Sequence, residues 1–280
     1  MRFLTWLPDS LYLRLLYYGE LGRWLNLSNP KRFTEKIQWL KLHDRRPEYT
    51  MMVDKYAVKD YVAAKIGAEF IIPTLGIWNS FDDIDFKSLP DKFVLKTTHG
   101  GGSGGVVICS DKSAFDMGKA RTKLEESLRS DIYTNYREWP YKNVPRRIIA
   151  EQFIEVPFNK DLPDYKIFCF NGTPRYIQVI KDRNTDESID FFDTEWNHQP
   201  FYGLNPNVHP STHDIPKPAN LEDMLKIACH LAKNIDFVRV DLYQTTDKVY
   251  FGELTFYPAS GMGVFNPDKW DLTLGEFINL

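Results

Sequence analysis

The stretch KFVLKTTHGGGSGGVVIC, residues 92–109, carries the strongest structural signal in the chain. Five glycines fall within residues 100–105, between two apolar runs of the kind that form strands. A loop with so few Cβ atoms lets backbone N–H groups come close to phosphate oxygens. We therefore expect two strands joined by a glycine-rich flap over a nucleotide phosphate chain; the alternative is a solvent loop without a ligand.

Three known phosphate-binding loops differ from this one in what surrounds the glycines. A Walker loop ends in Gly-Lys-Ser/Thr and opens a helix, and a dinucleotide fingerprint also leads into a helix, whereas this loop leads into a strand. In protein kinases the glycine loop precedes the lysine strand, but here Lys96 comes first, and the chain contains no HRD or DFG triplet. What remains is a lysine-bearing strand followed by a flap over a triphosphate.

The stretch FVRVDLYQTTDKVYFGELTFYPASG, residues 237–261, carries the second signal. If this hairpin turns around Asp247, Asp241 lies opposite Glu253. Arg239 then lies opposite Thr255, and the two-residue period of a strand puts all four side chains on one face. Two facing carboxylates repel each other unless a cation lies between them, and Mg²⁺ prefers one or two carboxylates together with phosphate oxygens. The pattern therefore favours a magnesium site, with a surface hairpin of compensating charges as the alternative.

Hairpins and helices alternate along the chain, which indicates an α+β fold rather than a doubly wound parallel sheet. The dipeptide Asn171-Gly172 between two apolar runs is a strong hairpin signal. Helices are expected to begin at Pro8-Asp9-Ser10, at Asn29-Pro30, after the cap Asp54, over 113–130 and after the cap Asn220. Strands are expected over 92–96, 105–109, 147–154, 165–170, 174–180, 188–192, 237–243 and 249–254.

Composition excludes several classes of protein. The 280 residues carry 35 basic and 38 acidic side chains, a net charge of −3, so we expect no nucleic-acid partner. Three cysteines without CxxC spacing argue against a disulfide framework or a structural zinc site and favour a reducing cytoplasm. The first residues are interrupted by charges and resemble neither a signal peptide nor a membrane span.

Taken together, the motifs resemble those of the TupA-like ATP-grasp family, which is named for teichuronopeptide synthesis and is similar to proteins found with polysaccharide biosynthesis. The segments that carry the resemblance are NPKRFTEKIQWLKLHDR, DKYAVKDYV, KTTHGGGSGG, IIAEQFIE, DYKIFCFNGTPRYI, RVDLY and ELTFYPASG. It implies two α+β lobes that clasp ATP, with a helical N-terminal segment over 1–53, a flap lobe over 54–150 and a metal-bearing lobe over 151–280. The usual Rossmann-like N-terminal domain is not evident.

The resemblance also implies roles for individual residues. For ATP binding it implies Lys55 and Lys96, the flap residues Gly100, Gly101, Gly102, Ser103, Gly104 and Gly105, the adenine-contacting Glu151 and Gln152, and the ribose-contacting Glu155. For chemistry it implies Lys166 facing the phosphates, Arg239 steadying the intermediate, and Asp241 and Glu253 as magnesium ligands. Many members of the superfamily have Asn where this chain has Thr255, whose hydroxyl is a weaker magnesium ligand.

The implied activity is an ATP- and Mg²⁺-dependent carboxylate–amine ligase that works through an acyl phosphate. The expected carboxylate is a sugar acid or glycan precursor and the expected amine an amino acid, in surface polysaccharide biosynthesis. One alternative is a nucleotide-binding glycan-assembly partner without ligase activity. Another is a glycosyltransferase, for which we find no convincing DxD motif.

The first 46 residues have a charge balance of their own. They hold nine basic and four acidic side chains, a local net charge of +5, beside an apolar helix face. We expect these helices to pack on the catalytic lobes; the alternative is peripheral contact with an anionic membrane at the cytoplasmic face. His99 in the flap is expected either to contact phosphate or to be exposed, and His209 and His213 are expected to be ordinary loop residues.

Overall fold

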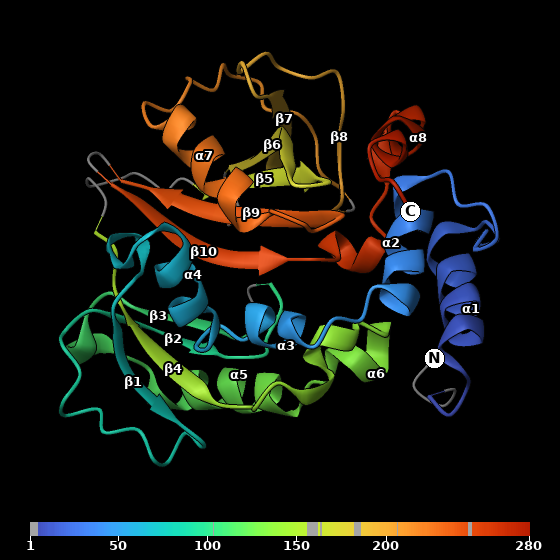
Figure 1. Cartoon of the computed structure of the whole chain (residues 1–280). Helices are drawn as coiled ribbons and strands as arrows, with labels where there is room; N and C mark the ends of the chain where they lie inside the picture. Colours follow the sequence, from blue (N-terminus) through green and yellow to red (C-terminus); the bar gives the residue numbers. More distant parts are fainter. Residues whose placement is uncertain are drawn as a thin grey trace. The chain divides into compact units, whose positions relative to one another are not determined.

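The computed structural model describes residues 5–102, 104–155, 162, 164–181, 186–205, 207–245 and 248–280. The chain forms two compact units, one of Arg46–Glu155 and one assembled from Met1–Arg45 together with Val156–Leu280. Antiparallel sheets and helices make up both units, so the fold is α+β, as expected (Figure 1).

The unit of residues 46–155 is built on a four-stranded antiparallel sheet in the order β1-β4-β2-β3. Its strands are β1 (Thr74–Trp78), β2 (Phe93–Thr97), β3 (Val106–Cys109) and β4 (Ile148–Gln152). Its helices are α3 (Glu48–Val53), α4 (Val58–Ile66), α5 (Met117–Arg129) and α6 (Ile132–Tyr136). Burial alternates along β2, because Phe93 and Leu95 join Leu124 of α5 in the core. Lys96 therefore points to the opposite face of the sheet.

The discontinuous unit is built on a five-stranded antiparallel sheet in the order β10-β9-β5-β6-β7. Its strands are β5 (Asp164–Phe170), β6 (Thr173–Lys181), β7 (Ser188–Asp193), β9 (Phe237–Gln244) and β10 (Val249–Thr255), with β8 (Tyr202–Gly203) and β11 (Phe265–Asn266) paired separately. Its helices are α1 (Asp9–Leu21), α2 (Phe33–His43), α7 (Leu221–Leu231) and α8 (Lys269–Glu276).

The two faces of the five-stranded sheet differ in character. Helix α7 packs on β5, β6 and β9, over the face that includes Val238, Val240 and Leu242 (Figure 1). The other face is aromatic at one end, where the ring of Phe33 from α2 meets Phe168 and three other aromatic rings. Further along the same face the side chains become charged. The N-terminal helices thus complete the core of the unit that contains the last strands of the chain.

The expected elements are present, with shifted ends. Helix α2 begins at Phe33, not at Asn29-Pro30, because Glu35 folds back and accepts the N–H groups of Lys31 and Arg32 at 2.8 and 3.1 Å. Asn220 occupies the position before α7, but its side chain makes no capping hydrogen bond there. The hairpin at Asn171-Gly172 is confirmed, with φ angles of 48° and 78°.

The basic residues near the N-terminus are bound within their own unit. Six of them bind carboxylates or carbonyl oxygens there: Arg14, Arg23, Arg32, Lys36, Lys41 and Arg45. Among the described residues no helix is both long and apolar enough to cross a membrane. The local excess of positive charge therefore accords with packing on the unit.

Candidate functional site

Three lysines and one carboxylate, here called the lysine cluster, belong to the unit of residues 46–155: Lys55, Lys59, Lys96 and Glu151. Lys96 on β2 and Glu151 on β4 lie on the sheet face opposite α5, with Nζ 2.6 Å from Oε2. Lys59 on α4 lies 2.6 Å from the other carboxylate oxygen, Oε1. Burial favours the neutral acid, but Lys96 and Lys59 outweigh it and hold the pKa of Glu151 below its ordinary value.

Lys59 is a member of this cluster that the sequence analysis missed. Its ammonium also donates to the carbonyl oxygen of Ile72 at 2.7 Å, and burial lowers its pKa against the opposing effect of Glu151. Lys59 follows Lys55 by four residues, which is helical spacing, so the sequence did contain a signal. Its partnership with Glu151, however, depends on how α4 packs against β4.

The glycine loop contains two kinds of glycine. A Cβ on Gly100 or on Gly105 would lie 2.4 Å from the hydroxyl oxygen of Thr97, so both positions need glycine for packing. Gly102 and Gly104, at the tip, have nothing within 4 Å of such a Cβ, and Gly101 has only Ile132 at 3.5 Å. Packing against the rest of the described chain therefore does not require glycine at the tip. Ser103 lies outside the described residues.

Lys55 fixes the start of this loop. Its N–H group donates to the carbonyl oxygen of Thr98 at 2.9 Å, and its Nζ donates to that of Gly100 at 2.5 Å. His99 is only 3% exposed, so the expectation of an exposed side chain is wrong. Burial lowers the pKa of His99, and the charges of Arg146 and Lys55 lower it further.

The remaining residues expected to contact ATP are not members of the lysine cluster. Gln152 is exposed at the end of β4. Glu155 is also exposed and pairs with Lys92 at 2.8 Å. Glu151 directs its carboxylate at two lysines, so its expected contact with adenine, like those of Gln152 and Glu155, stays a prediction.

A second group of charged side chains, here called the carboxylate cluster, lies on the five-stranded sheet: Asp164, Lys166, Arg239, Asp241, Glu253 and Thr255. The predicted register is confirmed, since Glu253 pairs with Asp241 and Thr255 with Arg239. This register depends on a β-bulge at Gly252. Phe251 pairs with Leu242 and Glu253 pairs with the adjacent Asp241, so Gly252 has no partner of its own on β9. The expected turn around Asp247 lies outside the described residues.

Arg239 binds both facing carboxylates. Its Nε and Nη2 donate to the two oxygens of Asp241 at 2.7 Å each, and Nη2 lies 3.6 Å from Oε1 of Glu253. Nη2 also donates to the hydroxyl of Thr255 at 3.1 Å. The cation that two facing carboxylates require is thus already supplied by the protein. The pairing by itself does not demand a metal, which corrects the argument drawn from the sequence.

Lys166 on β5 extends the cluster by one strand. Its Nζ lies 2.5 Å from Oδ2 of Asp241 and 2.9 Å from Oδ2 of Asp164. Burial raises the pKa of Asp241, and Arg239 and Lys166 oppose that rise.

The cluster offers carboxylate oxygens, the ligand type that Mg²⁺ uses in proteins, but both oxygens of Asp241 already accept from Arg239 and one of them from Lys166. Glu253 is the more accessible of the two facing carboxylates, with a side chain 30% exposed against 2% for Asp241. Among the described residues no group of three or more His, Cys, Asp or Glu side chains could hold a metal by itself. A metal bound here would need further oxygen ligands, which phosphate groups supply in typical magnesium sites.

Gln178 on β6 is a further neighbour that the sequence did not reveal. It pairs with Lys166 across the sheet and is buried, and its carbonyl oxygen has no hydrogen-bond partner among the described residues. A regular hairpin at Asn171-Gly172 would place Ile177 opposite Lys166. An irregularity between Phe168 and Cys169 moves Gln178 there instead.

Comparison with known proteins gives one family. A family model described as TupA-like ATPgrasp matches residues 35–279. No curated protein matches the chain. Similar solved structures include the ATP complex of D-alanine–D-alanine ligase from Bacillus anthracis, with a TM-score of 0.42, 16% identity and coverage of 74% of this chain and 54% of that one.

Two further structures show the same distant similarity. D-alanine–D-alanine ligase from Helicobacter pylori has a TM-score of 0.43 and 14% identity, over 89% of this chain and 70% of that chain. A RimK domain ATP-grasp protein from Sphaerobacter thermophilus has a TM-score of 0.42 and 13% identity, over 82% and 69%. The chain spans about half the length of the Bacillus anthracis ligase.

Proposed function

The chain belongs to the TupA-like ATPgrasp family, and from this premise we propose that it is an ATP- and Mg²⁺-dependent ligase that joins a carboxylate to an amine. The carboxylate is first phosphorylated by ATP, and the amine then displaces phosphate from the acyl phosphate to give an amide and ADP. The carboxylate cluster is the observation that carries the proposal. It combines two facing carboxylates with two fixed cations on one sheet face.

The lysine cluster suits the phosphate chain of ATP. Lys59 and Lys96 share the single carboxylate of Glu151, and Lys55 holds the start of the neighbouring glycine loop. Glu151 holds the ammonium groups of Lys59 and Lys96 in place by ion pairs. The open backbone of the loop tip can donate N–H groups to phosphate oxygens.

The carboxylate cluster suits the reacting groups. Asp241 and Glu253 are the residues that would hold Mg²⁺, which neutralises charge on the transferring phosphoryl group. Thr255 would be at most a weak ligand, because its hydroxyl is already bonded to Arg239 and lies 3.4 Å from Glu253. Arg239 and Lys166 are held by Asp241 before any substrate arrives, so their positive charges need no rearrangement to stabilise developing negative charge.

We assign the substrates from the family resemblance. They are a sugar acid, free or as part of a glycan precursor, and an amino acid, joined during surface polysaccharide biosynthesis. We place the reaction in the cytoplasm, which accords with the free thiols of Cys109, Cys169 and Cys229. Contact with an anionic membrane has less support, because six basic side chains of residues 1–46 are bound within their own unit.

The test is a screen of pairs of sugar acids and amino acids for ADP release, with mass spectrometry of the product. We expect ADP release that requires both members of one pair and an amide that is lighter than their sum by one water. Glu253→Gln serves as the matched control and should lose ADP release while remaining folded. Release of AMP would contradict the acyl phosphate route. Binding of ATP without ADP release for any pair would favour the inactive nucleotide-binding partner.

A further inference from the structure

A strained turn follows the strand that carries Glu253 and Thr255. Ala259, Ser260 and Gly261 are three consecutive residues in the left-handed region, with φ angles of 47°, 53° and 64°. Residues other than glycine rarely adopt this conformation, and two in succession persist only where the surroundings enforce them. The conformation of this turn therefore depends on what packs against it.

Helix α2 supplies the groups that hold the turn. Nε2 of Gln38 donates to the carbonyl oxygens of Ser260 at 3.0 Å and Gly261 at 2.9 Å. Nζ of Lys41 donates to the carbonyl oxygen of Ser260 at 2.7 Å. A Cβ on Gly261 would lie 2.5 Å from Nε2 of Gln38, so the turn and the helix are in close contact.

The groups that hold the turn belong to a buried polar stripe along α2. Thr34, Gln38 and Lys41 recur at intervals of four and three residues and so lie on one face of the helix. All three are at most 1% exposed. Lysine is almost never fully buried without a specific partner, and apolar residues of similar size commonly stabilise a core at least as well. A stripe of this kind is explained by a need for defined geometry rather than by packing alone.

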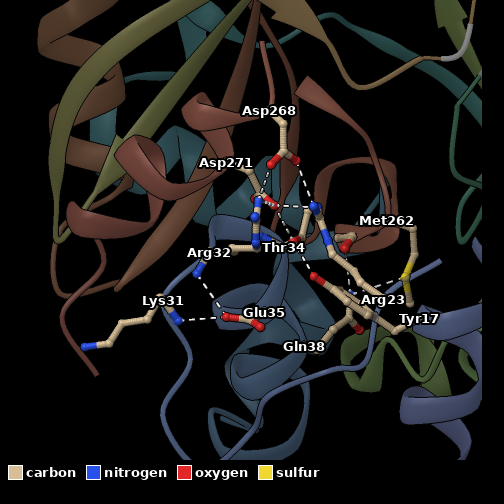
Figure 2. Close-up of polar contacts among 11 residues, drawn as sticks. Tyr17, Arg23, Lys31, Arg32, Thr34, Glu35, Gln38, Met262, Asp268 and Asp271 are labelled. Atoms are coloured by element: carbon tan, nitrogen blue, oxygen red, sulfur yellow. Dashed lines mark hydrogen bonds and ion pairs between the residues drawn. The ribbon is translucent and has the colours of Figure 1, made fainter. Parts of the chain in front are cut away.

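The N-terminal end of the same helix is fastened to α8, not to the turn. The N–H and hydroxyl of Thr34 both donate to Asp271 at 2.9 Å, and the hydroxyl of Tyr17 lies 2.8 Å from that of Thr34 (Figure 2). Arg23 and Arg32 converge on Asp268 and Asp271 in the same view. Helix α2 is thus a fixed element, and its middle can set the position of another segment.

We propose that Gln38 and Lys41 are positioning residues that hold the turn at 259–261 and, through it, the end of β10 that presents Glu253 and Thr255. The connection is short and rigid, because β10 ends at Thr255 and only the buried residues 256–258 separate it from the turn. A displaced turn would therefore shift the metal end of the strand. This inference rests on the proposed function, since it assigns the magnesium site to the same strand.

The test uses Mn²⁺ as a paramagnetic probe and ATP, so that it needs no acceptor substrate. Gln38→Met and Lys41→Met replace the polar groups with side chains of similar length. We expect each to weaken Mn²⁺ binding in the ATP complex by about tenfold and to change the electron paramagnetic resonance spectrum of bound Mn²⁺. Binding of ATP without metal should stay unchanged. If circular dichroism shows that Lys41→Met is unfolded, the result for Gln38→Met alone tests the proposal.

The matched controls are Thr34→Val, on the same stripe, and Tyr17→Phe, on its partner. Thr34→Val weakens the attachment of α2 to α8, and Tyr17→Phe weakens its attachment to α1. Both should lower the melting temperature while leaving Mn²⁺ affinity and spectrum as in the wild type. Equal losses of affinity in these controls and in the Gln38 and Lys41 variants would overturn the inference. Wild-type affinity in folded Gln38→Met would also overturn it. A wild-type protein that binds no Mn²⁺–ATP would instead overturn the proposed function, and the inference with it.

Discussion

Glu253 lies directly opposite Asp241 because one extra residue, Gly252, is accommodated in strand β10 as a bulge. Without the bulge, the pairing of Phe251 with Leu242 would continue and Gly252 would face Asp241. The two carboxylates would then fall out of register, and Glu253 would lose its place beside Arg239. The arrangement of the carboxylate cluster is therefore a consequence of local backbone irregularity as much as of side-chain identity.

Gly252→Val should disrupt the cluster. A Cβ at this position would lie 3.0 Å from the carbonyl oxygen of Asp241 and from the ring of Tyr243, so the larger valine side chain would press on the neighbouring strand at the bulge. We expect a loss of about 1–3 kcal/mol in the free energy of unfolding and loss of ADP release. Gly118→Ala, where the nearest atom is 3.4 Å away, is the control and should leave both quantities nearly unchanged.

Glu253→Gln and Asp241→Asn should both reduce turnover but differ in stability. Each should lower ADP release by about two orders of magnitude or more, on the order of 3 kcal/mol of transition-state stabilisation. Asp241→Asn also leaves the buried cations Arg239 and Lys166 without their shared carboxylate, so it should destabilise the fold as well. Steady-state kinetics and urea unfolding separate the two effects. Wild-type turnover in both variants would remove the site assignment.

Lys96→Ala should chiefly weaken ATP binding. The side chain lies on the sheet face shared with Glu151 and faces no residue of the α5 core, so its removal leaves that core intact. Isothermal titration with ATP is the measurement, and Lys119→Ala, which breaks an exposed pair with Asp116, is the control. Equal affinities for wild type and Lys96→Ala would contradict a phosphate-binding role for this lysine.

Stability should fall as the pH is lowered from 7 to 5, in part because of His99. Burial lowers the pKa of His99, so near pH 6 the folded protein binds fewer protons at this ring than the unfolded chain does. The contribution of His99 is therefore complete above the unfolded pKa of about 6.5 and is lost as the pH falls towards the lowered folded pKa. The slope from this group should reach at most about 1.4 kcal/mol per pH unit.

Urea unfolding at pH 7 and at pH 5 measures this dependence. His99→Gln should reduce the difference between the two conditions, because glutamine does not titrate. His230→Gln, at an exposed position on α7, should retain the wild-type difference. If His99→Gln loses as much stability between pH 7 and pH 5 as the wild type does, the acid sensitivity arises from other groups.

Two buried glutamines should respond in opposite directions to replacement by methionine. Gln178 has a buried carbonyl oxygen without a partner, so Gln178→Met should stabilise the fold by about 1 kcal/mol. The carbonyl oxygen of Gln38 likewise has no partner among the described residues, but its amide nitrogen donates two hydrogen bonds to the strained turn. Gln38→Met loses both of these bonds and should destabilise the fold by about 1–2 kcal/mol. Denaturant unfolding of the two variants under identical conditions provides the comparison. If Gln178→Met is less stable than the wild type, the amide of Gln178 makes its hydrogen bonds in solution.

The sequence predicted local elements well and tertiary partners less well. Apolar runs bounded by turn signals located β2, β5, β6, β9 and β10 to within about two residues. Burial alternates along β2, whereas all seven residues of β5 are buried. The pairing of Lys59 with Glu151 joins residues 92 positions apart and follows from helix packing, which periodicity does not encode. The irregularities near Gly252 and Cys169 shift register by one residue, and neither has a clear signature in a single sequence.

The packing of α1 and α2 against the C-terminal part of the chain was the least predictable feature of the fold. Their composition suggested a basic surface, yet four of the nine basic side chains bind partners more than 200 residues later: Arg23 and Arg32 bind Asp268 and Asp271, and Lys36 and Lys41 bind the carbonyl oxygens of Ile278 and Ser260. Nothing in a local window relates Thr34 to Asp271. Such contacts become visible only when the whole sheet order is known.

The discontinuous unit has a consequence for the order of events on the ribosome. Residues 46–155 are complete as a unit once they have emerged, and they can fold while synthesis continues. Helices α1 and α2 are synthesised before this unit, but Phe33, Thr34 and Gln38 find their partners only after β9, the turn at 259–261 and α8 have been made. During that interval their apolar faces are exposed to the cell. These two helices are thus synthesised before residues 46–155 and buried after them, and they are where we expect chaperones to bind.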